Sequence, residues 1–153
     1  MCPYRAAPRS SRRQGRLFCR TLLPEDAVLT PVGGPGKEFW AAGKNWDIVT
    51  KGLKPENLAL MGQWRVEVSP GGPRKTDVFL HVLQVGDQKL KSMDRIELLQ
   101  EPGRSGVRLS TGSQAWEVIF NTTGPLAGRI RRTGGPGPID RPLATTVQPQ
   151  SGI

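Results

Sequence analysis

Short runs of alternating apolar and polar residues, separated by turn-forming residues, make up most of this chain. The clearest run is Trp64–Val68, where a tryptophan and two valines alternate with an arginine and a glutamate. This period of two is typical of a β-strand with one face buried and the other in solvent. We therefore predict a strand here, ended by the Pro-Gly-Gly-Pro run at residues 70–73.

The run Asp77–Val85 is apolar on both faces. Phe79, His81, Leu83 and Val85 share one face, and Val78, Leu80 and Val82 share the other. A strand of this kind is usually covered on both sides, as in the middle of a packed fold. We expect a central strand.

Further strands are predicted throughout the chain and are short. They lie at 16–23, 27–32, 94–99, 106–110, 115–121 and 127–131. Because 19 glycines and 14 prolines punctuate the 153 residues, long helices are disfavoured. The pattern predicts an all-β fold, an antiparallel β-sandwich with disordered N- and C-terminal tails. The expected core residues are Trp64, Val66, Val68, Phe79, Leu83, Trp116, Val118 and Phe120.

The formal net charge of +9 is concentrated at the two ends of the chain. Residues 1–20 hold six arginines and no acid, and residues 129–153 carry a net +3, which together account for all of it. A nucleic-acid-binding module usually has its basic patch on the folded body. Nucleic-acid binding is therefore a secondary alternative here. No run of 18 apolar residues is present, so no membrane span is expected.

Candidate chemistry for an active site is sparse. His81 is the only histidine, and we interpret it as packed beside Phe79 and Leu83 with one hydrogen-bond partner. Cys2 and Cys19 are not at metal-ligand spacing, so no metal or other cofactor is predicted. No carboxylate pair, hydrolase motif or lyase base can be singled out either. The sequence thus yields no catalytic residue, and whether the chain belongs to an enzyme stays uncertain on this ground.

Two polar segments have two alternative interpretations each, a ligand site or a simple turn or strand entrance. Gly33–Lys37 lacks the full spacing of a phosphate-binding loop and has no predicted helix after it, so we interpret it as a β-turn. The cluster around Arg74 and Lys75 either binds an anionic ligand or forms a solvated strand entrance.

Trp40 and Trp46 are the candidates for sugar contact. Both flank a polar loop, and an exposed indole ring can stack on the apolar face of a sugar. A place in the core is the alternative for each. With Arg74 and Lys75 they complete the predicted carbohydrate-contact set.

Several stretches together resemble the C-terminal region of heparinase II/III-type polysaccharide lyases, over about residues 15–131. The resemblance rests on the sequences GRLF and TLLP, on VGGPGKEFW followed by GKN, and on WRVEVSP and DVFLHVL. It implies a parent enzyme with an N-terminal helical toroid, a central sandwich and a C-terminal sandwich, which cleaves acidic polysaccharides by β-elimination. The catalytic motifs of such enzymes lie in the toroid and central sandwich and do not match this chain.

The resemblance also implies a domain plan. Residues 1–14 form a disordered leader, 15–32 the strands that end the preceding sandwich, 33–131 the C-terminal sandwich and 132–153 a flexible tail. The leader lacks the apolar stretch of a secretory signal. It also does not match the family, which suggests a truncated or misassigned start. The parent enzyme is expected in the periplasm or outside the cell.

Three functions therefore stay open. The chain is a supporting portion of a lyase that meets its polysaccharide through the parent enzyme, an independent carbohydrate-binding module, or a basic nucleic-acid-binding protein.

Overall fold

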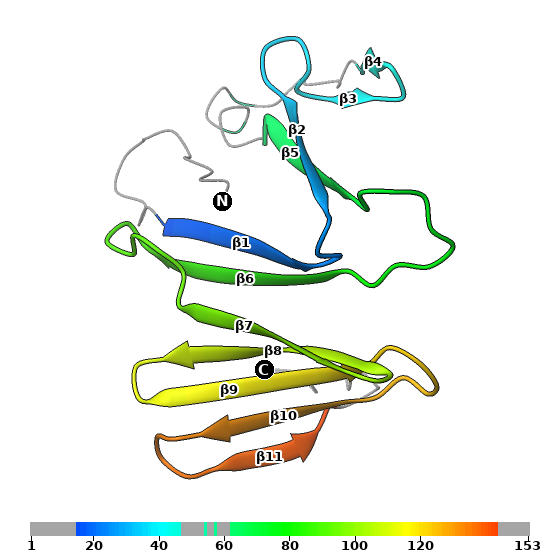
Figure 1. Ribbon diagram of the computed structural model, residues 1–153. Coiled ribbons are helices and arrows are strands. Elements are labelled where there is room, and N and C mark those ends of the chain that lie inside the picture. Colours follow the sequence, from blue (N-terminus) through cyan, green and yellow to red (C-terminus); the bar gives the residue numbers. More distant parts are fainter. Residues whose placement is uncertain (1–14, 47–53, 55–56, 58–61, 144–153) are drawn as a thin grey trace. The chain divides into compact units, whose positions relative to one another are not determined.

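The labelled elements of the computed structural model are all β-strands (Figure 1), which confirms the predicted all-β, antiparallel fold. The structure describes residues 15–46, 54, 57 and 62–143. The predicted leader at 1–14 and the last ten residues of the predicted tail lie outside this part. The chain divides into two units, one of which spans Pro24–Asp77.

The other unit is a sandwich of two sheets. β1 (Gly15–Leu23) pairs antiparallel with β6 (Leu80–Asp87) as a two-stranded sheet. The second sheet has five antiparallel strands that follow one another in chain order, as Figure 1 shows. They are β7 (Arg95–Glu101), β8 (Arg104–Thr111), β9 (Gln114–Asn121), β10 (Gly128–Thr133) and β11 (Ile139–Pro142).

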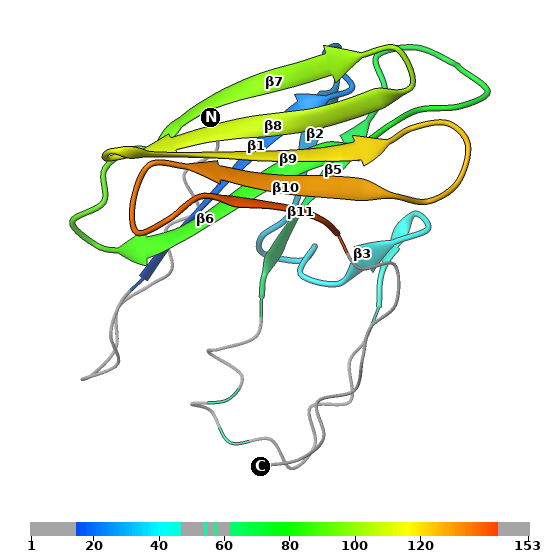
Figure 2. The ribbon, with the colours of Figure 1, turned by 90° about the horizontal axis from the view of Figure 1, so that it is seen from below.

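The core of this sandwich is small and lies between the two sheets. Leu22 and Val82 from β1 and β6 are buried with Ile96 and Val107 from β7 and β8. Leu80, Met93, Leu98, Leu109 and Val118 pack around these four residues. Figure 2 shows β1 and β6 passing behind the five-stranded sheet at an oblique angle. The predicted sandwich architecture is therefore present in this unit.

The buried face of β6 is the opposite of the one expected. Val82 is buried, whereas Leu83 is 61 % exposed and Phe79 and Val85 also face solvent. Because both faces of this strand are apolar, its period alone cannot choose between them. Pairing with β1 decides which face of β6 is buried, because Leu22 of β1 and Val82 of β6 pack together against the five-stranded sheet. Phe79 and Leu83 are thus wrong as core residues, and β6 is covered on one side.

The remaining core predictions have mixed outcomes. Val118 packs against the core, whereas Val68 and Trp116 are only partly buried. Trp64, Val66 and Phe120 are exposed, so their assignment to the core is wrong. Trp64 and Val66 lie in the Pro24–Asp77 unit, where they belong to a sheet of two strands. So narrow a sheet brings few side chains of its own to cover an apolar face.

The outer face of the five-stranded sheet carries a ladder of charges with alternating sign. The strand register places Glu97 opposite Arg108, Arg108 opposite Glu117, Glu117 opposite Arg131, and Arg131 opposite Asp140. Arg108 donates to Glu117 over 2.6 Å and lies 3.4 Å from a Glu97 oxygen. Opposite charges on facing strands favour one register over a slipped one.

Two observations bear on the predicted domain plan. β1, predicted as one of the strands that end a preceding sandwich, pairs with β6 between Gly15 and Leu23 within this sandwich. The flexible tail was predicted to begin at 132, but residues 139–142 form β11, which pairs with β10. A four-residue edge strand between prolines has too little alternation to be seen in the sequence.

The second unit contains two short sheets. β2 (Val28–Gly33) pairs antiparallel with β5 (Trp64–Ser69), and β3 (Trp40–Ala41) forms a hairpin with β4 (Lys44–Asn45). The alternation in β5 puts Arg65 and Glu67 on the face that also carries Val32 and Thr30 of β2.

The core assignment makes a direct prediction for two apolar residues. Ile96→Ala should lower the free energy of unfolding by about 2–5 kcal/mol, because it removes a side chain that is only 6 % exposed. Leu83→Ala should change it by less than about 0.5 kcal/mol, because that side chain already faces water. Urea unfolding followed by circular dichroism measures both. A larger loss for Leu83→Ala than for Ile96→Ala would contradict the assigned faces.

Candidate functional site

The second unit has a hollow of about 440 Å³, open to solvent, beside the β2–β5 sheet. Its wall combines the polar face of this sheet with the turn after β2 and the β3 hairpin. The lining residues are Thr30, Pro31, Val32, Gly33, Lys37, Trp40, Ala41, Ala42, Arg65 and Glu67. The hollow therefore joins an aromatic ring, two cations and one carboxylate. We call it the Trp40 groove.

The turn after β2 places Lys37 in the groove. The amide of Lys37 donates to the carbonyl of Gly34 over 2.8 Å, and Gly36 between them has a φ of 77°. Proline followed by a positive-φ glycine is the signature of a type II turn. A Cβ on Gly34 would lie 2.6 Å from the Trp64 ring, so only glycine fits there. The predicted β-turn is confirmed.

The β3–β4 hairpin places Trp40. Its two loop residues, Ala42 and Gly43, have φ values of 49° and 79°, as a type I′ turn requires. Asn45 faces Trp40 across the hairpin, and its Oδ1 accepts a hydrogen bond from the amide of Phe39 over 2.8 Å. The tryptophan is thus held on a short, well-bonded hairpin.

Trp40 and Lys37 form a joint aromatic and cationic surface. The Lys37 Nζ lies 5.2 Å from the centroid of the Trp40 ring, within the range of a cation–π contact. In the described part of the chain, no carboxylate lies within 4 Å of Lys37 as an ion-pair partner. The ammonium group is thus available to an anionic ligand.

Arg65 and Glu67 neutralise each other on the sheet wall. The Nε and Nη2 of Arg65 donate to the same oxygen of Glu67, over 2.9 and 2.6 Å. Both side chains stay about half exposed. The second oxygen, Oε2, accepts no hydrogen bond from the described residues, so it can accept one from a ligand hydroxyl.

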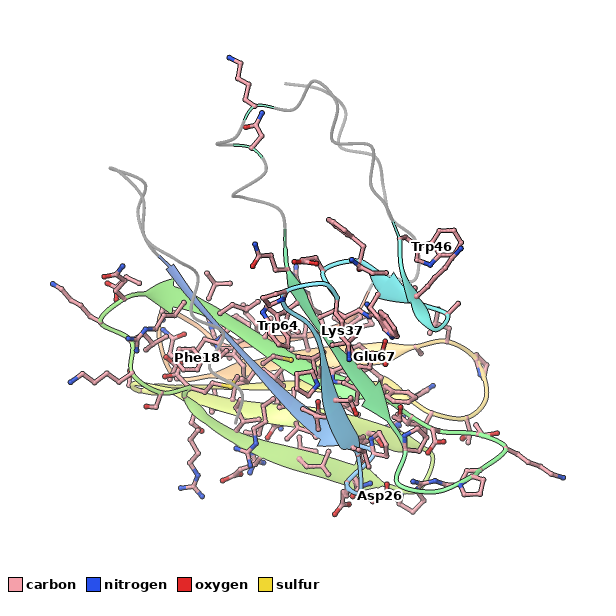
Figure 3. The ribbon with its side chains drawn as sticks, turned by 90° about the horizontal axis from the view of Figure 1, so that it is seen from above. Phe18, Asp26, Lys37, Trp46, Trp64 and Glu67 are labelled. Carbon is pink, nitrogen blue, oxygen red and sulfur yellow. The ribbon has the colours of Figure 1, made fainter. Side chains whose placement is uncertain are left out.

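Trp46 lies outside the lining of the groove, although it was predicted together with Trp40. Its indole N–H donates to the Ala41 carbonyl over 3.0 Å, and the Lys44 Nζ lies 3.6 Å from its ring centroid. The ring is 49 % exposed, but its polar end is bonded within the hairpin. In Figure 3, Lys37 and Glu67 lie close together, with Trp46 apart from them on the hairpin.

Arg74 and Lys75 lie in the segment that follows β5, away from the groove residues of that strand. Arg74 contacts both carboxylate oxygens of Asp26 at 2.6 Å, and its Nε is 3.2 Å from Asp77. The charge of Arg74 is therefore compensated within the protein. Lys75 is exposed, and within the described ranges no acid pairs with it.

His81 lies on the exposed side of β6 and not in the core. Its Nδ1 is hydrogen-bonded to the Thr21 hydroxyl at 3.0 Å, and its ring lies 6.2 Å from that of Phe79. The single hydrogen-bond partner agrees with the prediction for His81. The exposed position of the side chain contradicts its predicted packing in the core. In the described parts of the chain, no three His, Cys, Asp or Glu side chains gather as metal ligands. Nor does any helix among those residues have the length and apolar character to cross a membrane.

Lys37, Arg65 and Glu67 are the groove residues that the sequence prediction missed. Arg65 and Glu67 were assigned to the polar face of a strand, and that assignment holds. The hollow arises because a hairpin stands beside this face, and no local pattern encodes that proximity. The signal that could have identified Lys37 is the type II turn, which ends at Lys37, three residues before Trp40 in the sequence.

No protein-family model matches this chain, and a search of curated proteins finds no relative.

The positive φ of Ala42 predicts a stabilising substitution in the hairpin. Ala42→Asn creates the Asn-Gly pair that type I′ turns favour, because asparagine tolerates a left-handed backbone better than alanine. The free energy of unfolding should rise by about 0.5–1 kcal/mol. Thermal unfolding measures this, and Ala42→Val, which should destabilise, is the matched control. A loss of stability in Ala42→Asn would contradict the turn assignment.

The Arg74–Asp26 pair predicts a pH effect. The hydrogen bond from Arg74 lowers the pKa of the Asp26 carboxyl below its ordinary value of 3.8. A carboxyl with a lowered folded-state pKa stabilises the fold above its ordinary pKa and loses this contribution as the pH falls through the folded value. Arg74→Met should therefore raise the pKa of Asp26 towards 3.8. NMR titration of the carboxyl checks this.

The same substitution should cost stability at neutral pH, and the cost should shrink below about pH 3.8, where Asp26 loses its charge. Lys75→Met is the control, since it should leave the pKa of Asp26 unchanged. An Asp26 pKa that does not move in Arg74→Met would refute the pairing.

Proposed function

We propose that this chain is the C-terminal β-sandwich portion of a heparinase II/III-like polysaccharide lyase. In this role it contacts and supports the acidic polysaccharide, while the toroid and central sandwich of the parent enzyme carry out the β-elimination. The observation that carries the proposal is the Trp40 groove, where one open hollow is lined by an indole ring and by an ammonium group that has no ion-pair partner among the described residues.

The groove chemistry suits an acidic sugar. A sugar ring has an apolar face that stacks on indole, and a uronic acid adds a carboxylate that an ammonium group binds by a charge-assisted hydrogen bond. Trp40 and Lys37 offer these two groups in one place, with the Lys37 Nζ over the Trp40 ring at 5.2 Å from its centroid. The Arg65–Glu67 pair adds polar groups for hydroxyls.

The outer face of the β1–β6 sheet supports membership in a larger assembly. Leu17 faces Val85 and Cys19 faces Leu83 on this exposed side, so an apolar strip follows both strands. Monomeric proteins rarely leave an apolar patch of this kind uncovered unless it contacts another surface. In the proposed parent enzyme, the neighbouring sandwich is the surface that would cover it. Such a parent acts in the periplasm or outside the cell, where acidic polysaccharides occur.

An independent carbohydrate-binding module is the second candidate, and the same groove favours it. The two proposals differ in what the isolated chain needs. A module binds its glycan unaided and tightly, whereas a supporting portion binds weakly until the parent enzyme holds the same polymer. Nucleic-acid binding is the third candidate, and the neutral net charge of residues 21–128 counts against it.

The isolated chain should bind heparan sulfate, chondroitin or alginate without cleaving them. Isothermal calorimetry measures the binding, and ultraviolet absorbance of the unsaturated uronate product measures cleavage. Dextran, which has no charge, is the control and should bind more weakly. Robust unsaturated product from this chain alone would overturn the supporting role. Failure to bind any acidic glycan would overturn the contact role.

A further inference from the structure

We infer that the Trp40 groove selects uronic-acid glycans that carry a carboxylate as their only charge, and that it discriminates against their sulfated forms. The inference rests on the proposed function, since it specifies which acidic polysaccharide the groove accepts. It is drawn from the charges that line the hollow.

The first step is the charge count of the groove. Lys37 and Arg65 are its cations and Glu67 is its only carboxylate among the lining residues, so the wall carries a net +1. Arg65 is already bonded twice to Glu67, over 2.9 and 2.6 Å. One cation, Lys37, is therefore left for the ligand, which matches a single negative charge.

The second step is the position of that cation. The Lys37 Nζ lies over one face of the Trp40 ring, 5.2 Å from its centroid, which leaves the opposite face for a stacked sugar and keeps the ammonium group next to that sugar's edge. In a uronic acid the carboxylate is a substituent of the ring itself. A ring stacked on Trp40 therefore brings its carboxylate to Lys37, with the type II turn and the type I′ hairpin fixing both partners in advance.

The third step is the role of Glu67 in rejecting a second anion. Its Oε2 accepts no hydrogen bond from the described residues and can receive one from a sugar hydroxyl. A sulfate on that hydroxyl removes the donor and places a negative charge near the carboxylate. Like charges placed close together in a binding site are a recognised means of disfavouring a competing ligand. Glu67 is therefore the specificity-determining residue.

Chondroitin hexasaccharides provide a matched set of probes, because one backbone can be prepared unsulfated, sulfated or with its carboxylates reduced to alcohols. Calorimetry on the full chain should show the unsulfated form binding about threefold tighter than the sulfated form, the effect of one exposed charge pair. The carboxyl-reduced form should bind about tenfold more weakly than the unsulfated one, since it loses a charge-assisted hydrogen bond.

Three variants and one control assign the effect to named side chains. Lys37→Ala should weaken binding of the unsulfated form about tenfold and leave binding of the carboxyl-reduced form nearly unchanged. Glu67→Gln should tighten binding of the sulfated form and erase the threefold preference. Lys91→Ala removes an exposed lysine that is neither a lining residue nor a predicted sugar contact, and it should alter nothing. Trp40→Phe keeps an aromatic ring and tests stacking with less risk to the fold.

The possible failures are distinguishable. Tighter binding of the sulfated form by the wild type, or a preference unchanged in Glu67→Gln, overturns this inference and leaves the proposed glycan contact in place. If the Lys37 and Trp40 variants bind the oligosaccharides as tightly as the wild type does, the sugar contact lies outside the Trp40 groove. That result also overturns this inference. If no chondroitin, heparan sulfate or alginate oligosaccharide binds at millimolar concentration, the proposed contact fails together with the inference.

Discussion

The burial of Leu22 and Val82 against Ile96 and Val107 is the interaction on which the sandwich depends. Leu22 lies sixty residues before Val82 in the sequence, and the four side chains hold a two-stranded sheet against a five-stranded one. The β1–β6 ladder alone would be marginal in water, because two strands offer too little apolar area. Contact with β7 and β8 supplies the missing burial and fixes which face of β6 points inward.

The groove depends on a different kind of constraint, namely two turns whose backbone conformations restrict which residues can occupy them. The type II turn at Gly34–Lys37 is held by its own hydrogen bond, and bulk at Gly34 is excluded by the Trp64 ring. The type I′ hairpin presents Trp40 to the same hollow. Because both devices are local, the spacing of Lys37 and Trp40 depends little on the small core of the other unit.

The parts of the fold that the sequence predicts are those with strong local signals. The alternation of Trp64–Ser69 and the glycines at Gly33–Gly36 indicate a strand and a turn, and both are present. The buried face of β6 is not predictable, because it depends on a partner strand some sixty residues earlier in the chain, as the pairing of Thr21 with His81 shows. The groove escapes prediction for the same reason. In the sequence, Arg65 and Glu67 have only the pattern of an ordinary polar strand face. They line a groove because the β3–β4 hairpin lies beside that face.

A weak groove is compatible with the proposed role. One stacking contact and one charge-assisted hydrogen bond give modest affinity for a single sugar, since ordering the ligand opposes them. A polysaccharide held elsewhere on a parent enzyme presents its neighbouring units to the groove at a high effective concentration, so the second contact needs little strength of its own. Modest strength also lets the polymer move on between cleavage events. In the proposed role, a groove that offers one lysine to a uronate and keeps its arginine paired with Glu67 meets this need better than a strongly basic cleft.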